Sequence, residues 1–208
     1  HGIGVLVLTN GKLSEIIRPE AITVEKMQDQ SQRVIKPARP FGNILNLRKC
    51  FRECRNFMYW YETHLPRKVF EIIYEGIENS DISGVEVIKL LRALGDGVDG
   101  NMLSDFKRFR AELADKDMDV QLRVICDKKI AGTVHARYLY SEGVKFVIPP
   151  LNTLLANKWD KIFTSDEDIP DFDDYWKKGI DLVSDWNMIM KEKTSQDKRR
   201  SGIAEMSV

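Results

Sequence analysis

The stretch Thr133–Asn152, T-V-H-A-R-Y-L-Y-S-E-G-V-K-F-V-I-P-P-L-N, decides the fold that the sequence predicts. Its first nine residues alternate between two sets of side chains, which predicts a strand over residues 133–141. On such a strand His135 and Arg137 share one face, because side chains two positions apart point the same way. The Glu-Gly pair that follows predicts a tight turn into a second, shorter strand. The stretch therefore predicts a β-hairpin that carries a histidine and an arginine side by side.

The pairing of these two side chains suits a phosphate group. An imidazole titrates near neutral pH, whereas a guanidinium stays charged and offers a planar fork of donors. Counted from His135, the sequence reads H-x-R-x4-E-x6-P-P-x-N. This pattern resembles the signature of the phospholipase D superfamily, H-x-K-x4-D-x6-G-S-x-N. The signature positions fall on His135, Arg137, Glu142 and Asn152, with Pro149-Pro150 in place of Gly-Ser.

The resemblance implies a phosphodiester site assembled from two signature copies. In this superfamily one histidine attacks phosphorus, a second protonates the leaving oxygen, and the signature lysine stabilises the phosphoryl charge. The resemblance implies catalytic roles for His135, Arg137 and Glu142 if the domain is active. In a domain that only binds, it implies ligand contacts from His135, Arg137 and Asn152. The chain holds one copy of the signature, so a complete catalytic site would require a homodimer.

The departures from the signature favour binding without turnover. Arginine replaces lysine and glutamate replaces aspartate, which changes the reach of both charges, and the two prolines remove a hydroxyl and backbone donors. We therefore predict a phosphate-binding, phospholipase D-like module that acts as a ligand sensor or interaction domain. Its ligand would be a nucleic acid, a phospholipid head group or a phosphorylated metabolite.

Two relatives within the superfamily keep other functions open. The chain is similar to the non-catalytic phospholipase D-like domain found C-terminal to MIT domains, and to the effector domains of some archaeal winged-helix regulators. One alternative is a dimeric phosphodiesterase or nuclease with a histidine nucleophile from each subunit. Another is a structural oligomerisation domain of a DNA-binding regulator, in which His135 is buried and pairs with Glu142 and Asp127.

Composition limits the classes of partner. The 208 residues include 32 Lys+Arg and 32 Asp+Glu, so the formal net charge is zero and any anion site must be local. A hydrophobic content of 43% suffices for a core, and no apolar run approaches the length of a transmembrane helix. The 3 cysteines predict no disulfide framework, which indicates a reducing, cytoplasmic compartment. The sparse Cys and His residues predict no metal site, and no motif predicts a cofactor.

Strands and helices alternate before the hairpin, and a further strand and helix follow it. Apolar runs predict strands at 56–61, 85–91 and 119–126, with a further short strand at 158–164. Helical spacing predicts helices at 65–77 and 171–191, and another in which Met102, Phe106, Phe109 and Leu113 recur on one face. This order predicts an α/β fold, a mixed sheet flanked by helices that resembles the phospholipase D sandwich.

Three parts of the chain are distinguished by composition. Residues 1–40 are predicted to form an N-terminal hairpin and helical linker, the possible remnant of an upstream domain. Residues 41–192 are predicted to form the phospholipase D-like domain, with the boundary near residue 40 marked by prolines and a glycine. Residues 193–208 are polar and basic, and they predict a disordered tail.

Three other features are interpreted as structural. The aromatic run Tyr59-Trp60-Tyr61 is interpreted as sheet packing, because strands favour aromatic residues. The loop at 94–101, L-G-D-G-V-D-G-N, lacks the ending of a phosphate-binding loop and is interpreted as a connection. His64, in T-H-L-P-R-K, has no signature spacing around it.

Overall fold

A computed structural model of the chain describes residues 5–9, 12–17, 32–133, 137–155, 158–164 and 171–205. The chain divides into two units, His1–Arg33 and Val34–Val208. In the first unit, β1 (Val5–Thr9) and β2 (Lys12–Ile17) form an antiparallel two-stranded sheet. The domain boundaries expected near residues 40 and 192 stay predictions.

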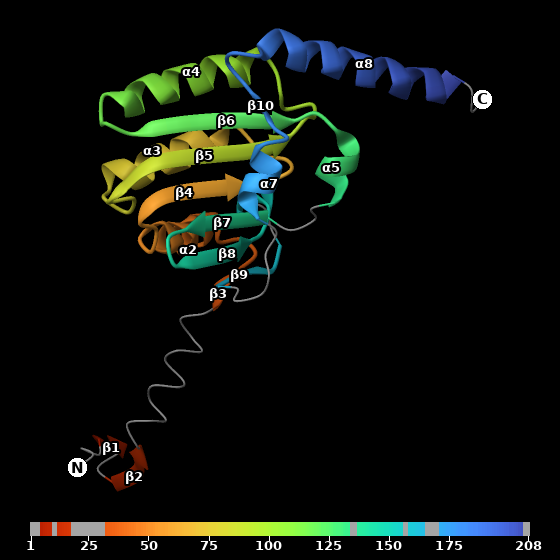
Figure 1. The fold of residues 1–208 in the computed structure, drawn as a ribbon. Coiled ribbons are helices and arrows are strands. Elements are labelled where there is room, and N and C mark those ends of the chain that lie inside the picture. Colours follow the sequence, from red (N-terminus) through yellow and green to blue (C-terminus); the bar gives the residue numbers. More distant parts are fainter. Residues whose placement is uncertain are drawn as a thin grey trace. The chain divides into compact units, whose positions relative to one another are not determined.

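An eight-stranded mixed sheet organises the second unit (Figure 1). Its strand order is β10-β6-β5-β4-β7-β8-β9-β3. The strands are β3 (Gln32–Ile35), β4 (Asn56–Tyr61), β5 (Val85–Ala93), β6 (Asp119–Ile125), β7 (Arg137–Ser141), β8 (Val144–Ile148), β9 (Asp160–Thr164) and β10 (Ile180–Asp181). The predicted α/β fold class is confirmed.

The strand directions create a switch point beside β4. β5 and β6 lie parallel to β4 on one side, whereas β7 runs antiparallel to β4 on the other side. β8 and β9 continue that side as antiparallel neighbours. The carboxyl ends of β4, β5, β6 and β8 therefore meet the amino end of β7 at one edge of the sheet, which we call the carboxyl edge. The opposite edge is called the amino edge. Ligands of open α/β sheets commonly bind at the carboxyl edge, next to such a switch point.

Three helices cover one face of the sheet: α2 (Pro40–Phe51), α3 (Lys68–Glu78) and α4 (Gly100–Ala114) (Figure 1). α4 begins where the Asp99 carboxylate accepts a hydrogen bond from the Met102 amide, an N-cap that fixes its start. Its predicted inward-facing residues are all buried. The sheet contributes alternate residues such as Met58 and Trp60, both 0% exposed, and Phe51 of α2 packs edge-on against Trp60. This face forms the main core.

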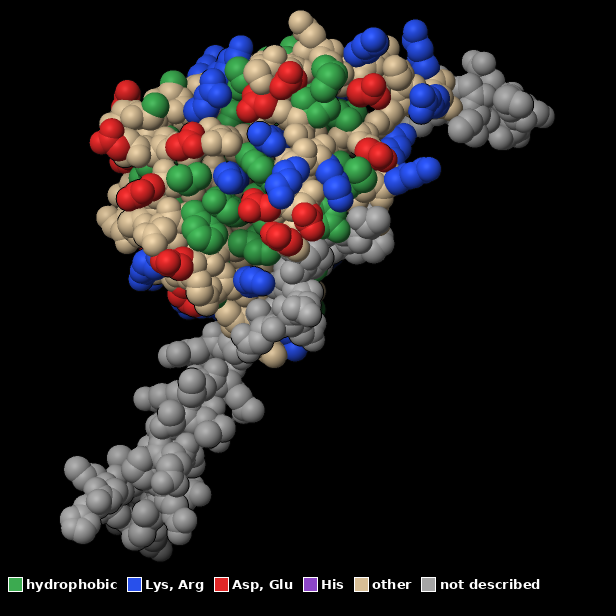
Figure 2. Space-filling model, in the orientation of Figure 1, with side chains coloured by type: hydrophobic (Ala, Val, Ile, Leu, Met, Phe, Trp, Pro, Cys, Tyr) green, Lys and Arg blue, Asp and Glu red, His purple; other side chains and the backbone are tan. Residues whose placement is uncertain are grey.

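The other face of the sheet is covered differently. α7 (Phe172–Trp176) packs there, with the Phe172 ring stacked 4.9 Å from the ring of Tyr59. Charged side chains lie among these aromatic rings, and Lys89 Nζ is 4.5 Å from the Tyr59 ring centroid. Figure 2 looks onto this face and shows hydrophobic, basic and acidic side chains mixed on it. Tyr59 and Trp60 thus pack on opposite faces of the sheet. This confirms the interpretation of the aromatic run Tyr59-Trp60-Tyr61 as sheet packing.

Two predicted elements are wrong in their bounds. The strand expected over residues 133–141 is β7 (Arg137–Ser141), and Thr133 instead ends a short helix, α5 (Lys128–Thr133). The single helix expected over 171–191 is broken into α7, β10 and α8 (Trp186–Glu205). Gly179 explains the break, because a Cβ there would lie 2.9 Å from Arg123 and Leu91 side-chain atoms, so the chain runs too close to the sheet for a helix.

The predicted disordered tail from Lys193 is also wrong as far as Glu205, because α8 continues through these residues. Two contacts anchor its first half to the carboxyl edge. Lys193 Nζ donates to the Val98 carbonyl at 2.7 Å, and Gln196 Nε2 donates to the Cys126 carbonyl at 2.8 Å. Among the described helices, none has the length and apolar composition needed to cross a bilayer.

Candidate functional site

The structure describes three of the four signature residues, and it separates one of them, Glu142, from the other two. His135 lies outside the described residues. Arg137 opens β7 and Asn152 lies in α6 (Leu151–Leu155) directly after β8, so both belong to the carboxyl edge. Glu142 lies in the turn after β7, at the amino edge, where it accepts a hydrogen bond from Asn56 Nδ2 at 2.5 Å. β7 is 5 residues long, and at about 3.3 Å per residue it places Glu142 roughly 16 Å from Arg137. Glu142 therefore does not join the other two residues.

A buried carboxylate lies next to Arg137. Tyr138 pairs with Tyr61, so the register places Arg137 opposite Glu62 at the end of β4. Glu62 is 0% exposed, and its Oε1 accepts a hydrogen bond from the Leu151 amide at 3.1 Å. Burial raises the pKa of Glu62 to about 7, although the Leu151 hydrogen bond and the charges of two arginines act in the opposite direction. Glu62 therefore changes its charge near neutral pH.

The second of these arginines, Arg92, is the penultimate residue of the apolar strand β5 and is 2% exposed. Its Nη1 donates to the Leu65 carbonyl at 2.7 Å, and its Nε donates to the Ala93 carbonyl at 3.1 Å. Nη1 also lies 3.4 Å from the Gly97 carbonyl. Burial lowers the pKa of Arg92 to about 10, with the charge of Glu62 opposing the shift, so the guanidinium stays charged at neutral pH. No described residue accepts a hydrogen bond from its Nη2.

A pocket of about 400 Å³ opens in front of this guanidinium. Its walls come from the loop after β4, the loop after β5 and the start of α6; they are His64, Leu65, Pro66, Arg92, Leu94, Gly95, Asp96, Gly97 and Asn152. The side chains of His64 and Asn152 are exposed at its mouth. Three features that lie far apart in the sequence thus line one pocket: His64, which is not part of the signature, the glycine-rich loop, and Asn152, which is part of the signature.

The glycine-rich loop packs directly against the guanidinium at one position in this wall. A Cβ on Gly97 would lie 3.4 Å from Arg92 Nη2 and 3.5 Å from Nη1, which is ordinary van der Waals contact. α8 braces the same loop, because Lys193 Nζ donates to the carbonyls of Asp96 and Val98. The interpretation of this loop as a plain connection is therefore incomplete, since the loop also forms one wall of the pocket.

The chemistry of the pocket suits an anion. It combines a charged guanidinium, an imidazole, a side-chain amide and the backbone of a glycine-rich loop, and Asp96 supplies its one carboxylate. A charge held at low exposure acts more strongly than one in water, because the surrounding dielectric constant is lower. Two larger hollows, of about 600 Å³ between α3 and α4 and about 560 Å³ beside α8, have mixed charges on their walls. Neither has a charged wall residue as buried as Arg92.

Sequence reasoning missed Glu62 and Arg92, the two most buried charged residues of this edge. A signal was present, since each directly follows or ends an apolar strand, N-F-M-Y-W-Y before Glu62 and V-E-V-I-K-L-L before Arg92. A charged residue at the carboxyl end of a buried strand is well placed to face a ligand. The signature lies on the hairpin that follows Glu62 and Arg92 in the sequence, so it did not indicate either residue.

Comparison with known proteins gives no family. No protein-family model matches the chain, and no curated protein matches it. Among solved structures, the chain is similar to one described as the structure of TrmBL2, an archaeal chromatin protein that shows a novel mode of DNA binding. The TM-score is 0.43 at 15% sequence identity, over 77% of this chain and 60% of that one. The chain thus spans less than two thirds of that protein, and a likeness this coarse carries no functional argument. The resemblance to phospholipase D stays a prediction.

Proposed function

We propose that this domain binds a phosphate-bearing ligand in the pocket at the carboxyl edge, without turning it over. The Arg92 guanidinium is the observation that carries the proposal. It is held in one orientation by the carbonyls of Leu65 and Ala93, it lines the pocket, and its Nη2 is not used by any described residue. A preorganised guanidinium favours phosphate, because its planar fork matches two phosphate oxygens.

The size of the pocket supports a small ligand. About 400 Å³ lies at the lower end of the range for small-molecule sites, which is roughly 300 to 1,000 Å³. A phosphorylated metabolite or a single head group fits this volume, and so does the terminal phosphate of a nucleic acid strand. The domain would then act as a sensor, in which occupancy of the pocket orders the loops that Arg92 and Lys193 hold.

The two sequence-based alternatives have less support from the site. A phosphodiesterase would need His135, which lies outside the described residues, and its proposed partner Glu142 lies at the opposite edge of the sheet. An oligomerisation domain of a DNA-binding regulator is compatible with a ligand pocket, since regulators often couple both. The DNA binding of TrmBL2 is not transferred to this chain, because the two folds are too weakly alike.

Calorimetric titration tests the proposal with inorganic phosphate, sulfate and phenyl phosphate. We expect His64→Ala and Asn152→Ala each to weaken binding about 10-fold, the scale of one hydrogen bond to a charged group. The matched control is Asn187→Ala, an exposed asparagine on α8 that does not line the pocket. Failure of the wild-type protein to bind any of the three anions would contradict the proposal, as would equal losses in the control.

Hydrolysis of bis(4-nitrophenyl) phosphate separates binding from catalysis. A protein that only binds should release no nitrophenolate above the rate of the Asn152→Ala variant. Turnover that disappears in His135→Asn would instead favour the phosphodiesterase.

A further inference from the structure

Exposed hydrophobic side chains gather on one side of the molecule. In the part of the chain that the structure describes, seven large hydrophobic residues are exposed, and Met188 on α8 is one of them. We call the other six the apolar flank: Val34 (41% exposed), Phe41 (87%), Leu45 (53%), Leu155 (41%), Trp159 (69%) and Phe163 (38%). They come from β3, α2, α6, β9 and the residue just before β9. Such a concentration marks an interaction site more often than scattered exposure does.

Sheet pairing and hydrogen bonds connect these elements. β9 and β3 are neighbours at the end of the sheet, and α2 lies beside them (Figure 1). Asn46 Nδ2 of α2 donates to the Val34 carbonyl at 3.0 Å, and Asn43 Nδ2 donates to the Leu154 carbonyl of α6 at 3.1 Å. The elements that carry the apolar flank are therefore neighbours at the β3 end of the sheet, although its residues are far apart in the sequence. Val34 and Phe163 alternate with the core residues Ile35 and Ile162 of their strands, so the flank continues around this end onto the face of the sheet away from α2.

The same segments are strongly basic. Residues 32–51 contain no acid, and the described residues of 151–164 contain a single acid, Asp160. Beyond Arg48, which pairs with Asp81, their cations include Lys36, Arg39, Lys49 and Lys158. The formal net charge of the whole chain is zero, so the excess positive charge of these segments is compensated by acidic residues in other parts of the sequence. A partner for it must combine apolar side chains with negative charge.

We propose that the apolar flank docks an acidic segment of another protein, whose apolar side chains contact Phe41, Leu45 and Trp159. A second copy of this chain is disfavoured, because a symmetric contact would bring the same cations together. The aliphatic residues Val34, Leu45 and Leu155 suit a polypeptide better than nucleic acid, whose interfaces are more polar. β3 is the outermost strand on one side of the described sheet. A peptide can pair with such a strand through backbone hydrogen bonds and so add a strand to the sheet. This proposal does not depend on the anion pocket.

Selection from a displayed library of random 12-residue peptides tests the proposal on the full chain. Enriched peptides should combine Asp or Glu with Leu, Val or aromatic residues, and they should be lost when the double variant Phe41→Ser/Leu45→Ser is the target. Met188→Ser is the matched control, because it removes an exposed hydrophobic residue of the same class from α8. No enrichment, enrichment of basic peptides, or equal loss with Met188→Ser would overturn the proposal.

Trp159 gives a direct spectroscopic readout of the enriched peptide. It is 69% exposed, whereas Trp60 and Trp176 are 0% and 6% exposed. The bound peptide should shift its emission to the blue and protect it from acrylamide. Lys36→Glu and Lys158→Glu should each weaken binding by about 3- to 10-fold at low salt, and Lys107→Glu on α4 should not. The same emission shift with phosphatidylserine vesicles but not with peptide would contradict the proposal, as would a dimer that Phe41→Ser dissociates.

Discussion

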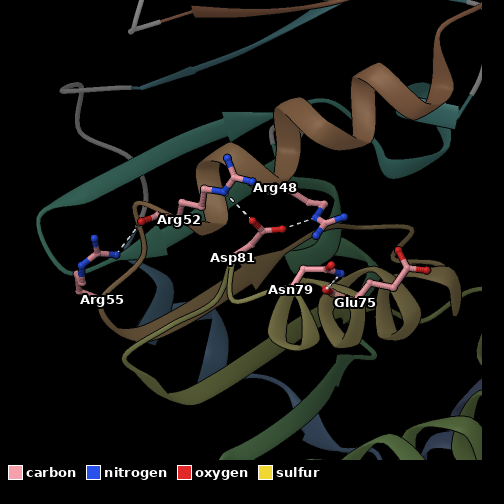
Figure 3. A network of polar contacts seen from close by, with 6 residues as sticks. All are labelled: Arg48, Arg52, Arg55, Glu75, Asn79 and Asp81. Carbon is pink, nitrogen blue, oxygen red and sulfur yellow. Dashed lines mark hydrogen bonds and ion pairs between the residues drawn. The ribbon is translucent and has the colours of Figure 1, made fainter.

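Two buried carboxylates, Asp81 at the amino edge and Glu62 at the carboxyl edge, have opposite environments. Asp81 is 2% exposed and lies between two arginines (Figure 3). It forms ion pairs with Arg48 and, at 2.6 Å, with Arg52. Burial alone would raise the pKa of Asp81, but hydrogen bonds from Arg52 and Arg48 outweigh burial and lower it. Glu62 is 0% exposed, and the Leu151 amide is the one hydrogen-bond donor that the described residues offer it, so burial dominates and raises its pKa.

The difference shows which arginines are already paired with an acid of the protein and which are not. At the amino edge Arg48 and Arg52 form ion pairs with Asp81, and these pairs connect α2 to the loop before β5. At the carboxyl edge Arg92 donates to backbone carbonyls, which carry no net charge, and Glu62 is close to neutral at pH 7. The positive charge there is thus available to a ligand. We regard the first cluster as structural and the second as the place where an anion binds.

Removing the acid of the structural cluster should have the largest effect. We expect Asp81→Asn to lower the free energy of unfolding by about 3 to 4 kcal/mol, because it leaves Arg48 without its partner in a buried site. Urea denaturation at pH 7 measures this loss. Arg52→Ala is the control, since the Arg52 side chain is 58% exposed and its loss should cost less than about 1 kcal/mol. Similar costs for the two variants would contradict the assignment.

The pH dependence of stability should differ in sign between the two acids. The folded-state pKa of Glu62 is about 7, above its ordinary value of 4.5, so the folded protein binds this proton more tightly than the unfolded chain does. Its contribution to stability is therefore greatest at low pH and falls as the pH rises from about 4.5 to 7. Between pH 5 and pH 7 the fall should be about 2 kcal/mol, from about 1.4 kcal/mol per unit of pKa shift.

Glu62→Gln isolates this contribution, since glutamine cannot ionise. Urea denaturation at a series of pH values should show the variant gaining stability over the wild type as the pH rises. Asp81 contributes in the other direction, because its pKa is lowered in the folded state and its stabilisation is lost as the pH falls through that value. Parallel pH profiles for the wild type and Glu62→Gln would contradict the raised pKa, because they would show that folding does not change the pKa of Glu62.

The smallest predicted effect links the two properties of the carboxyl edge. Protonation of Glu62 removes a negative charge beside Arg92 and Arg137, so sulfate should bind more tightly at pH 6 than at pH 8, by about 3- to 10-fold. Sulfate keeps its charge over this range, and calorimetry measures both constants. In Glu62→Gln this part of the pH dependence should disappear while affinity at pH 8 rises. An unchanged pH profile would separate Glu62 from the anion site.

Periodicity predicted the elements that pack locally. The spacing of Met102, Phe106, Phe109 and Leu113 identified α4, and apolar runs identified β4, β5 and β6, because each pattern reflects burial against one neighbouring layer. These elements were enough to predict the α/β class. The break at Gly179 was not predictable in this way, since Phe172, Trp176 and Ile180 continue a helical spacing and only the approach to Arg123 and Leu91 interrupts it.

The site depended on contacts that spacing does not encode. Arg92 reaches the Leu65 and Gly97 carbonyls because two crossover connections return to one edge of the sheet. The signature grouped Arg137, Glu142 and Asn152, because a linear motif does not show which end of a strand each residue occupies. The structure places Arg137 and Asn152 at the carboxyl edge and Glu142 at the amino edge. Whether these residues contact a ligand stays a prediction.

The location of a bound anion tests the central claim most directly. Crystals grown with tungstate, a phosphate analogue with a strong anomalous signal, would show where the anion lies. We predict a peak within hydrogen-bonding distance of Arg92, bounded by His64 and Asn152. A peak at Arg48 and Arg52, or no peak in a protein that calorimetry shows to bind phosphate, would contradict the assignment of the carboxyl edge.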